Sequence, residues 1–254
     1  MKDELLRIEH LNKRFGGLQA LSDVNIVVKR GEILGVIGPN GAGKTTLFNI
    51  ISGFLKPTSG KIIFEGKEIQ KYPPAKRVNM GIARTFQIVK PLKNLTVYEN
   101  ILTATGYKNY FGVSFFKRWN KEEYREKTEE ILKLVGLEKY RDKISGSLPL
   151  GLQKRIEIGR ALALNPKLLL LDEPTAGMSY EESEEIKKLI RDVHNKGVTI
   201  MLVEHNVPFA VDLTERMYVL SYGEIIAEDT PQEIVKNEKV IAAYLGGEYE
   251  IAQS

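Results

Sequence analysis

A glycine-rich loop follows a short apolar strand near the start of the chain. The segment "GVIGPNGAGKTTLFNIISG" matches the pattern G-x-x-x-x-G-K-[ST] from Gly38 to Thr45. Glycines let successive backbone N–H groups point at one phosphate, and a helix beginning near Gly43 adds its positive end. Lys44 can then reach the β- and γ-phosphates, and Thr45 can ligate Mg²⁺. The sequence therefore predicts a nucleotide-phosphate site, whose expected contacts are Gly38, Pro39, Asn40, Gly41, Ala42, Gly43, Lys44, Thr45 and Thr46.

Two adjacent acids end a second apolar strand. Asp172 and Glu173 follow the run Leu168 to Leu171, so we expect them at the carboxyl end of a core strand, where parallel sheets bind ligands. Asp172 can hold Mg²⁺ there, directly or through water. Glu173 points elsewhere and could polarise a water for in-line attack on the γ-phosphate. A pair of exposed acids that only ends a strand is the alternative, and the phosphate loop argues against it.

The composition is that of a globular protein. The chain has 254 residues, of which 43% are hydrophobic and 28% charged, and its net charge is +4. It contains no cysteine, which excludes disulfides, thiolate metal sites and a thiol nucleophile. No apolar run approaches the ~20 residues that a membrane helix needs. If a membrane is involved, we expect other chains to supply the spanning segments.

The periodicity predicts an α/β core into which a helical subdomain is inserted. The first third reads as strands and turns, with "VNIVVKRGE", the buried-strand run "ILGVIG" and a two-strand hairpin in "GKIIFEGKEI". From about 91 to 165 the pattern is helical. One helix has a plausible cap at Asn120 and stops at Gly136, and "GLQKRIEIGRALALNP" forms another.

The pattern then returns to the core. "KLLLLDE" and "VTIMLVEH" read as buried strands on either side of a helix that Ser179 caps and Glu182 completes as a capping box. Strand, helix and strand in this order predict a parallel pair with a right-handed crossover. Near the end, "TPQEIVKNEKVIAAYLGG" predicts a helix capped by Thr230, with Glu233 closing its box.

The combination of motifs resembles the ATP-binding-cassette ATPases. The segments "GPNGAGKTT", "LLLLDEPTAG" and "VEHN" come in that family's order. "GIARTFQIVKPLKNLTVYENI" and "VIAAYLGG" are similar to the ATP-binding subunits of branched-chain amino-acid importers. "ARTFQ", the long insert after "YENI" and the histidine of "VEHN" resemble the larger of the two ATPases that such importers carry.

The resemblance implies a fold and a division of the chain. The fold is a P-loop α/β core with a parallel sheet, an N-terminal antiparallel β subdomain and an inserted helical subdomain. All 254 residues would form one ATPase domain. The core with the β subdomain covers about 1–90, the helical subdomain about 91–165, the continued core about 166–222, and the C-terminal hairpin and helix about 223–254.

The resemblance also implies roles for residues that match the family's motifs. Gln87 would contact Mg²⁺ or the attacking water, His205 would contact the γ-phosphate, and Phe15 would stack on adenine. "LPLGLQ" occupies the place of the signature segment, so Leu150 and Gly151 would contact ATP on the opposite subunit. The blander alternatives are a solvated loop residue for Gln87, a polar strand end for His205 and a core ring for Phe15.

The implied partners follow from the same resemblance. They are two transmembrane permease subunits, a second ATPase subunit arranged head to tail (a paralogue or a second copy), and indirectly an extracytoplasmic substrate-binding protein. The implied location is peripheral, on the cytoplasmic face of the inner membrane, and no nucleic acid is expected. A non-transport cassette ATPase acting on DNA or ribosomes is the main alternative, and a P-loop kinase is a weaker one.

The signature segment departs from the common Leu-Ser-Gly-Gly-Gln. Pro149 replaces the serine and has neither a hydroxyl nor an N–H, so one donor to the partner's γ-phosphate is lost. Leu150 replaces the first glycine, and Leu152 replaces the glutamine, with Gln153 one step later. Either one composite site is weaker, or Gly151 and the helix end suffice, and we favour the second. Relatives often have aspartate where Ser179 stands, and either residue caps a helix.

An aromatic insert, residues 107–119, has no role fixed by the motifs. It contains Tyr107, Tyr110, Phe111, Phe115, Phe116 and Trp119. Such rings among lysines and arginines could stack on nucleic-acid bases. They could instead form a small satellite core or part of the surface that meets the membrane subunits, and both of these alternatives are favoured over nucleic acid.

Overall fold

The computed structural model describes residues 3–85, 91–107 and 122–251. The chain forms two compact units. Unit 1 contains Met1–Arg77, Leu170–Glu173 and Thr199–Ser254, and unit 2 contains Val78–Leu169 and Pro174–Val198. Gln87, the predicted cap Asn120 and all of the aromatic insert except Tyr107 lie outside the described residues. No helix within the described part of the chain is long and apolar enough to cross a membrane.

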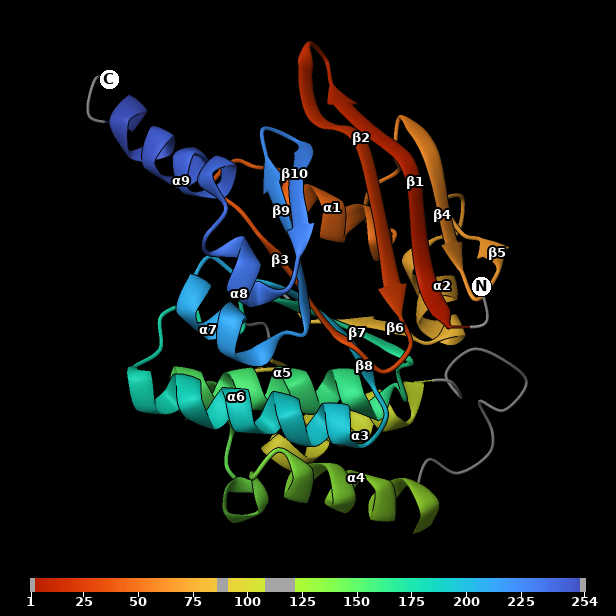
Figure 1. Ribbon diagram of the computed structural model, residues 1–254. Helices are drawn as coiled ribbons and strands as arrows, with labels where there is room; N and C mark the ends of the chain where they lie inside the picture. Colours follow the sequence, from red (N-terminus) through yellow and green to blue (C-terminus); the bar gives the residue numbers. More distant parts are fainter. Residues whose placement is uncertain (1–2, 86–90, 108–121, 252–254) are drawn as a thin grey trace. The chain divides into compact units, whose positions relative to one another are not determined.

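The N-terminal strands of unit 1 form an antiparallel sheet (Figure 1). Its strands are β1 (Glu4–Phe15), β2 (Leu18–Lys29), β4 (Ser59–Phe64) and β5 (Lys67–Glu68), in the order β2-β1-β4-β5. Leu6, Ile8 and Leu11 of β1 are buried, because alternate residues of a strand face the same side of the sheet. The predicted hairpin in "GKIIFEGKEI" is confirmed, with Phe64 paired to Lys67.

A second sheet of unit 1 carries the phosphate loop. Its strands are β3 (Ile33–Ile37), β7 (Leu168–Asp172, of which the last three residues lie in this unit), β8 (Thr199–Val203), β9 (Arg216–Ser221) and β10 (Glu224–Asp229). They follow the order β10-β9-β3-β8-β7, and β3 is parallel to both β8 and β9. All residues of β3, β7 and β8 are buried, as expected for strands covered on both faces. The predicted adjacency of β7 and β8 is confirmed.

Helices of different lengths complete unit 1. They are α1 (Lys44–Ile51), the start of α2 (Pro74–Met80), α7 (Val207–Leu213), α8 (Pro231–Ile234) and α9 (Glu238–Ile251). The prediction of one C-terminal helix with a Thr230–Glu233 capping box is wrong. Thr230 precedes α8 without a side-chain cap bond. The Asn237 side chain instead accepts from the backbone N–H groups of Lys239 and Val240, at 3.0 and 3.4 Å, and starts a separate helix.

One arginine is buried at the end of α1. Arg77 is 1% exposed, and its guanidinium donates to four backbone carbonyls. They belong to Ile50 at 2.5 Å, Ile51 at 2.8 Å, Tyr72 at 3.0 Å and Gln70 at 3.3 Å. The last carbonyls of a helix lack intrahelical partners, so Arg77 fixes the end of the helix that begins at the phosphate loop. Burial lowers the pKa of Arg77 to about 10, which leaves it charged at neutral pH.

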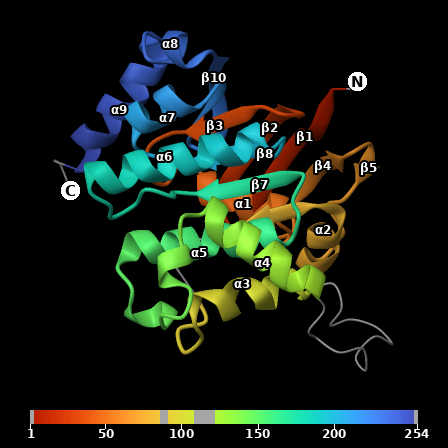
Figure 2. The ribbon, with the colours of Figure 1, turned by 90° about the horizontal axis from the view of Figure 1, so that it is seen from below.

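Unit 2 is mainly helical. It contains the short strand β6 (Ile82–Arg84), α3 (Val97–Thr105), α4 (Glu122–Leu134), α5 (Leu150–Ala163) and α6 (Tyr180–Asn195). Helices α3, α4 and α5 pack against one another (Figure 2). The capping box of α6 is confirmed, because Ser179 Oγ accepts from the Glu182 N–H at 3.2 Å and Glu182 Oε2 accepts from the Ser179 N–H at 2.9 Å.

Candidate functional site

The loop after β3 has a backbone that only glycine allows at two of its points. Gly38 and Gly43 have φ angles of 154° and 107°. A Cβ on Gly38 would lie 1.9 Å from the Leu220 carbonyl oxygen, and one on Gly43 would lie 2.7 Å from that of Ala20. The glycines therefore let the loop lie directly against neighbouring backbone. Helix α1 begins at the next residue, Lys44, so its unpaired N–H groups open onto this loop.

The lysine of the loop is turned back onto the loop itself. Lys44 Nζ donates to the carbonyl oxygens of Gly38 at 2.6 Å and of Pro39 at 2.9 Å. Burial lowers the pKa of Lys44, and the charges of Glu173, Asp172 and Glu204 oppose that shift. Three carboxylates of the second sheet are thus close enough to the ammonium group to affect it. This arrangement brings Lys44 together with both acids that the sequence singled out.

Glu173 has an unusual backbone conformation. Its φ of 46° is in the left-handed region, which is costly for a residue with a long side chain. Its N–H donates to the Val203 carbonyl at 2.9 Å, across the ends of β7 and β8. Both acids are buried at this turn, Asp172 at 1% exposed and Glu173 at 9%. Strained residues of this kind are frequent at functional sites.

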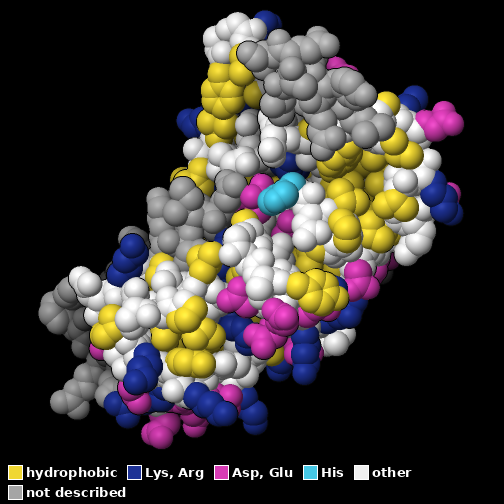
Figure 3. Space-filling model, turned by 90° about the vertical axis from the view of Figure 1, so that its left-hand side faces the viewer, with side chains coloured by type: hydrophobic (Ala, Val, Ile, Leu, Met, Phe, Trp, Pro, Cys, Tyr) yellow, Lys and Arg dark blue, Asp and Glu magenta, His cyan; other side chains and the backbone are white. Residues whose placement is uncertain are grey.

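His205 follows β8 and approaches Glu173. Its Nδ1 lies 3.6 Å from Glu173 Oε2, and its side chain is 53% exposed against 12% for Glu173. Figure 3 shows a histidine at the surface beside acidic side chains. Because β3 and β8 are parallel, His205 and the loop leave the sheet at the same edge. Lys44, Asp172, Glu173 and His205 therefore gather at one edge within unit 1.

Phe15 ends β1 and is 46% exposed. The Lys13 ammonium lies 4.8 Å from the centre of its ring, a cation–π distance. The ring is thus at the surface and is not a core residue, so it remains available for stacking. Gln87, which is expected to contact Mg²⁺ or the attacking water, lies outside the described residues.

The signature segment belongs to unit 2 and is described separately. Pro149 precedes α5 without a side-chain cap, so Leu150 and Gly151 form the first turn of this helix. A Cβ on Gly151 would lie 2.8 Å from Glu182 Oε1, so a larger residue here would displace the end of the Glu182 side chain. The Gln153 side chain donates to the Leu148 carbonyl at 2.7 Å. It folds back onto its own segment instead of replacing the glutamine that Leu152 displaces.

The donors around Lys44 fit a hard cation only in part. Asp172 offers a carboxylate and Thr45 a hydroxyl, and both are oxygen ligands of the kind that Mg²⁺ takes. Among the described residues, no group of three or more His, Cys, Asp or Glu side chains could hold a metal. A Mg²⁺ ion here would therefore depend on phosphate oxygens and water for the rest of its shell.

Two features of this edge were not predicted from the sequence. The left-handed φ of Glu173 is a property of the backbone, and Glu is not a residue type that signals it. Glu204 is fully buried next to His205, and its Oε2 accepts weakly from the Asn206 N–H at 3.4 Å. The motif "VEHN" contains this glutamate, but a charged residue after a strand normally indicates exposure.

Two family models match parts of this chain. The family model described as ABC transporter matches residues 21–176. A second model, described as branched-chain amino acid ATP-binding cassette transporter, matches residues 224–250. These matches include the phosphate loop, the two acids and the C-terminal helices.

The chain is similar to whole proteins of this kind. A probable branched-chain amino acid transport ATP-binding protein, LivG of Archaeoglobus fulgidus, is 41% identical over 248 residues, 96% of each chain. The lipopolysaccharide export system ATP-binding protein LptB of Haemophilus influenzae is 36% identical over 247 residues, 97% of this chain and 99% of that one. A crystal structure of an ATP-binding cassette of an ABC transporter in its ADP conformation matches with a TM-score of 0.86 and 38% identity, covering 96% of this chain and 99% of that one. The predicted fold class is confirmed.

Proposed function

The chain belongs to the ABC transporter family of ATP-binding proteins, and we propose that it is the ATP-hydrolysing subunit of an importer for branched-chain amino acids. The proposed substrate rests on one observation: a relative of nearly equal length is named as a branched-chain amino acid transport protein. The match of residues 224–250 to a branched-chain model supports it. The lipopolysaccharide export relative makes export the second candidate. We also propose that both units form one ATPase domain.

Binding would begin with an exchange at the phosphate loop. The N–H groups at the start of α1 and in the loop would surround the β-phosphate. Lys44 Nζ would leave the carbonyls of Gly38 and Pro39 and turn to the β- and γ-phosphates. The ring of Phe15 would offer its face to adenine, with Lys13 on the other face. The loop glycines make this approach possible, because a Cβ would occupy the space that the backbone needs.

Hydrolysis would rest on the acids at the end of β7. Glu173 would accept the proton of the attacking water, and His205, at 3.6 Å from it, would contact the γ-phosphate. Asp172 and Thr45 would hold Mg²⁺ together with Gln87. That ion neutralises charge on the phosphate oxygens when it is bound. Lys44 and the loop N–H groups would meet the remaining charge that develops on the transferred phosphoryl group.

The second subunit would complete the site. ATP bound at the loop of one subunit would be covered by the first turn of α5 in the other, where Gly151 keeps its N–H and the helix end is positive. The protein would pair in this way with a paralogue or with a second copy. It would lie peripherally at the cytoplasmic face of the membrane against two permease subunits, and would be served indirectly by an extracytoplasmic substrate-binding protein. Nucleic acid has no part in this proposal.

The unusual Pro149 provides a test of that composite site. Pro149→Ser is expected to change ATP turnover of the assembled transporter by less than about tenfold, because Gly151 and the helix end remain. A missing oxyanion-type donor costs roughly 10²–10³-fold, so a hundredfold gain on restoring the hydroxyl would contradict the proposal. Ser147→Ala is the matched control, because this neighbouring hydroxyl donates to the Ile144 carbonyl of its own turn, at 2.8 Å.

The proposed function is tested by isolating the chain from its native membranes with its partners attached. We expect mass spectrometry to find two hydrophobic permease chains and a second ATPase. Reconstituted into vesicles with those partners, the assembly is expected to accumulate leucine, isoleucine or valine when ATP is present on the ATPase side. Co-purification with ribosomes or DNA would replace the proposal by a non-transport ATPase. Movement of lipopolysaccharide would favour the export alternative.

A further inference from the structure

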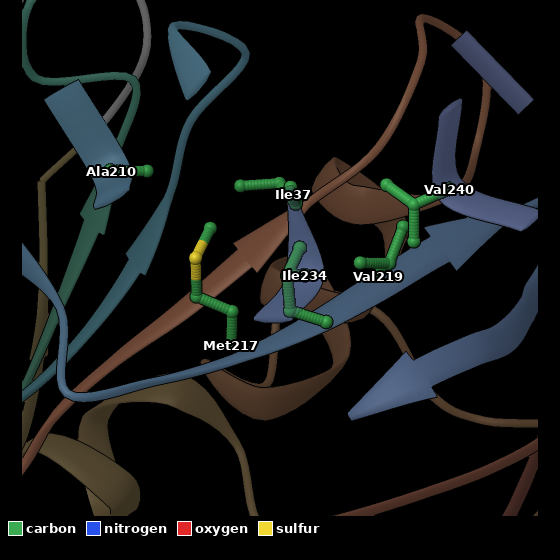
Figure 4. Close-up of a cluster of buried hydrophobic side chains, with 6 residues drawn as sticks. All are labelled: Ile37, Ala210, Met217, Val219, Ile234 and Val240. Atoms are coloured by element: carbon green, nitrogen blue, oxygen red, sulfur yellow. The ribbon is translucent and has the colours of Figure 1, made fainter. Parts of the chain in front are cut away.

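A tight turn lies beside the phosphate loop at the edge of the second sheet. Strand β3 leads into the loop at Gly38, and its parallel neighbour β9 leads into a two-residue turn, Tyr222 and Gly223, before β10. The last residue of β3, Ile37, pairs with Val219 of β9, and both belong to one buried cluster (Figure 4). The other buried members of this cluster are Ala210, Met217, Ile234 and Val240. The sheet and the cluster therefore hold the turn next to the loop.

Gly223 is pressed against the backbone of β2. Tyr222 and Gly223 have φ angles of 46° and 82°, the pair of left-handed residues that a tight two-residue hairpin requires. A Cβ on Gly223 would lie 2.8 Å from the carbonyl oxygen of Ala20 and 3.1 Å from Cα of Leu21. The Gly223 carbonyl accepts from the Ser22 N–H at 2.8 Å. A side chain at position 223 would therefore push the turn away from β2.

The same glycine also contacts the phosphate loop. Its N–H donates to the Ala42 carbonyl at 3.0 Å, a regular hydrogen-bond length. The Ala42 carbonyl and the Gly43 N–H belong to one planar trans peptide group, so they point in opposite directions. The bond that draws the carbonyl toward Gly223 therefore directs the Gly43 N–H away from the turn. This N–H is one of the loop donors that the proposed function assigns to the β-phosphate.

We propose that Gly223 is a positioning residue for nucleotide binding, whose N–H holds the peptide group between Ala42 and Gly43 so that the Gly43 N–H faces the phosphates. The inference rests on the proposed role of the loop. Gly43 has no side chain that would oppose a rotation of this peptide group. A rotated group would present the Ala42 carbonyl oxygen to the anion in place of a donor. The hydrogen bond from Gly223 prevents this rotation.

The inference predicts a loss of affinity that is confined to phosphate-bearing ligands. In the full chain, Gly223→Ala is expected to raise the Kd for ADP, measured by calorimetry, by about tenfold. The reason is that the new Cβ meets β2 and moves the N–H away from Ala42, which weakens a hydrogen bond to a charged group. Adenosine lacks the phosphates, so its Kd, measured by NMR titration, should stay within about twofold of the parent value. A general loss of structure would weaken both ligands.

Gly66→Ala is the matched control. Gly66 occupies the second position of the other two-residue hairpin of unit 1, between β4 and β5. Its φ is 74°, and that of Glu65 before it is 49°. A Cβ on Gly66 meets nothing within 4 Å. This variant therefore introduces the same left-handed strain and should lower the thermal midpoint, while the Kd for ADP stays unchanged.

An ester at position 223 removes the N–H alone. Glycolic acid, delivered by a suppressor tRNA in place of the glycine, adds no Cβ, so this variant tests the hydrogen bond even if Gly223→Ala does not fold. Its Kd for ADP should also rise by about tenfold. Parent-like ADP binding by either variant at position 223 would overturn the inference, as would equal weakening by Gly66→Ala or an equal loss of adenosine affinity. If Lys44→Ala also binds ADP like the parent, the loop is not the phosphate site and the proposed function itself fails.

Discussion

Replacing Glu173 by glutamine is expected to slow ATP hydrolysis by about 10²–10⁴-fold while ATP remains bound. The amide keeps the length and shape of the side chain but cannot accept a proton from water. The strained turn that aims the residue is made by the backbone, through φ 46° and the N–H bond to Val203, so it does not depend on the carboxylate. The measurement is phosphate release at saturating ATP with Mg²⁺, together with equilibrium binding of ATP.

Two further variants separate the effect on ATP binding from the effect on the rate of phosphate release. Glu224→Gln removes an exposed acid of β10 in the same unit and should leave both quantities unchanged. Lys44→Ala removes the group that reaches the phosphates, so it should weaken binding as well as turnover. If Glu173→Gln hydrolyses ATP within tenfold of the parent, another group accepts the proton and the role given to Glu173 is wrong.

Replacing Arg77 by methionine is expected to destabilise the protein by about 3 kcal/mol, because hydrogen bonds to charged groups contribute about 1.5–3 kcal/mol each and buried orphan carbonyls are costly. Methionine fills a similar volume but cannot donate to the carbonyls of Ile50, Ile51, Tyr72 and Gln70. The stability of Arg77→Lys should lie between those of the parent and of Arg77→Met, because an ammonium group can donate to some of the carbonyls but lacks the planar fork of donors. Urea unfolding followed by circular dichroism gives the midpoints.

Arg30→Met is the matched control for the loss of an arginine. Arg30 pairs with Glu65 at 3.0 Å on the surface of unit 1, where its side chain is 43% exposed. Such pairs contribute about 0–1 kcal/mol, so its midpoint should stay near that of the parent. Coincident unfolding curves for Arg77→Met and Arg30→Met would show that the carbonyls find water or relax. If Arg77→Met yields no folded protein, Arg77→Lys can still be compared with Arg30→Met. A lower unfolding midpoint for Arg77→Lys would support the role of the buried guanidinium, and an equal midpoint would contradict it.

The chemistry of the site could be predicted because it depends on residue type. A lysine in a glycine loop and two acids after a leucine run each point to a phosphate, and parallel strands bring their ends to one edge. The contacts that Lys44 makes with its own loop could not be predicted, since they depend on backbone oxygens that every residue carries. The left-handed turn at Glu173 could not be predicted either, because it is a backbone conformation that a glutamate does not signal.

The errors in the fold have a similar origin. Thr230, Pro231 and Glu233 are good signals for the start of a helix, and a helix does begin there. It stops after one turn because Asn237, read as an interior residue, caps the next helix instead. The sequence gives no signal for the burial of Arg77, because arginine usually indicates a surface and its burial depends on four carbonyls from two separate segments, residues 50–51 and 70–72. The pattern predicts where helices begin, but their ends depend on side-chain contacts, such as the local cap by Asn237 and the long-range bonds of Arg77 to the end of α1.

The self-contact of Lys44 also bears on how the protein tells its ligands apart. A ligand that lacks phosphate groups offers Lys44 Nζ no acceptor to replace the carbonyl oxygens of Gly38 and Pro39, at 2.6 and 2.9 Å. The ammonium group should therefore keep these two hydrogen bonds. Adenosine, and AMP with its single short anionic arm, would then gain only what the ring and ribose provide. The step from one phosphate to two is where affinity should rise most steeply. The phosphate loop would thereby bind nucleotides with two or three phosphates in preference to AMP and adenosine, before any second subunit takes part.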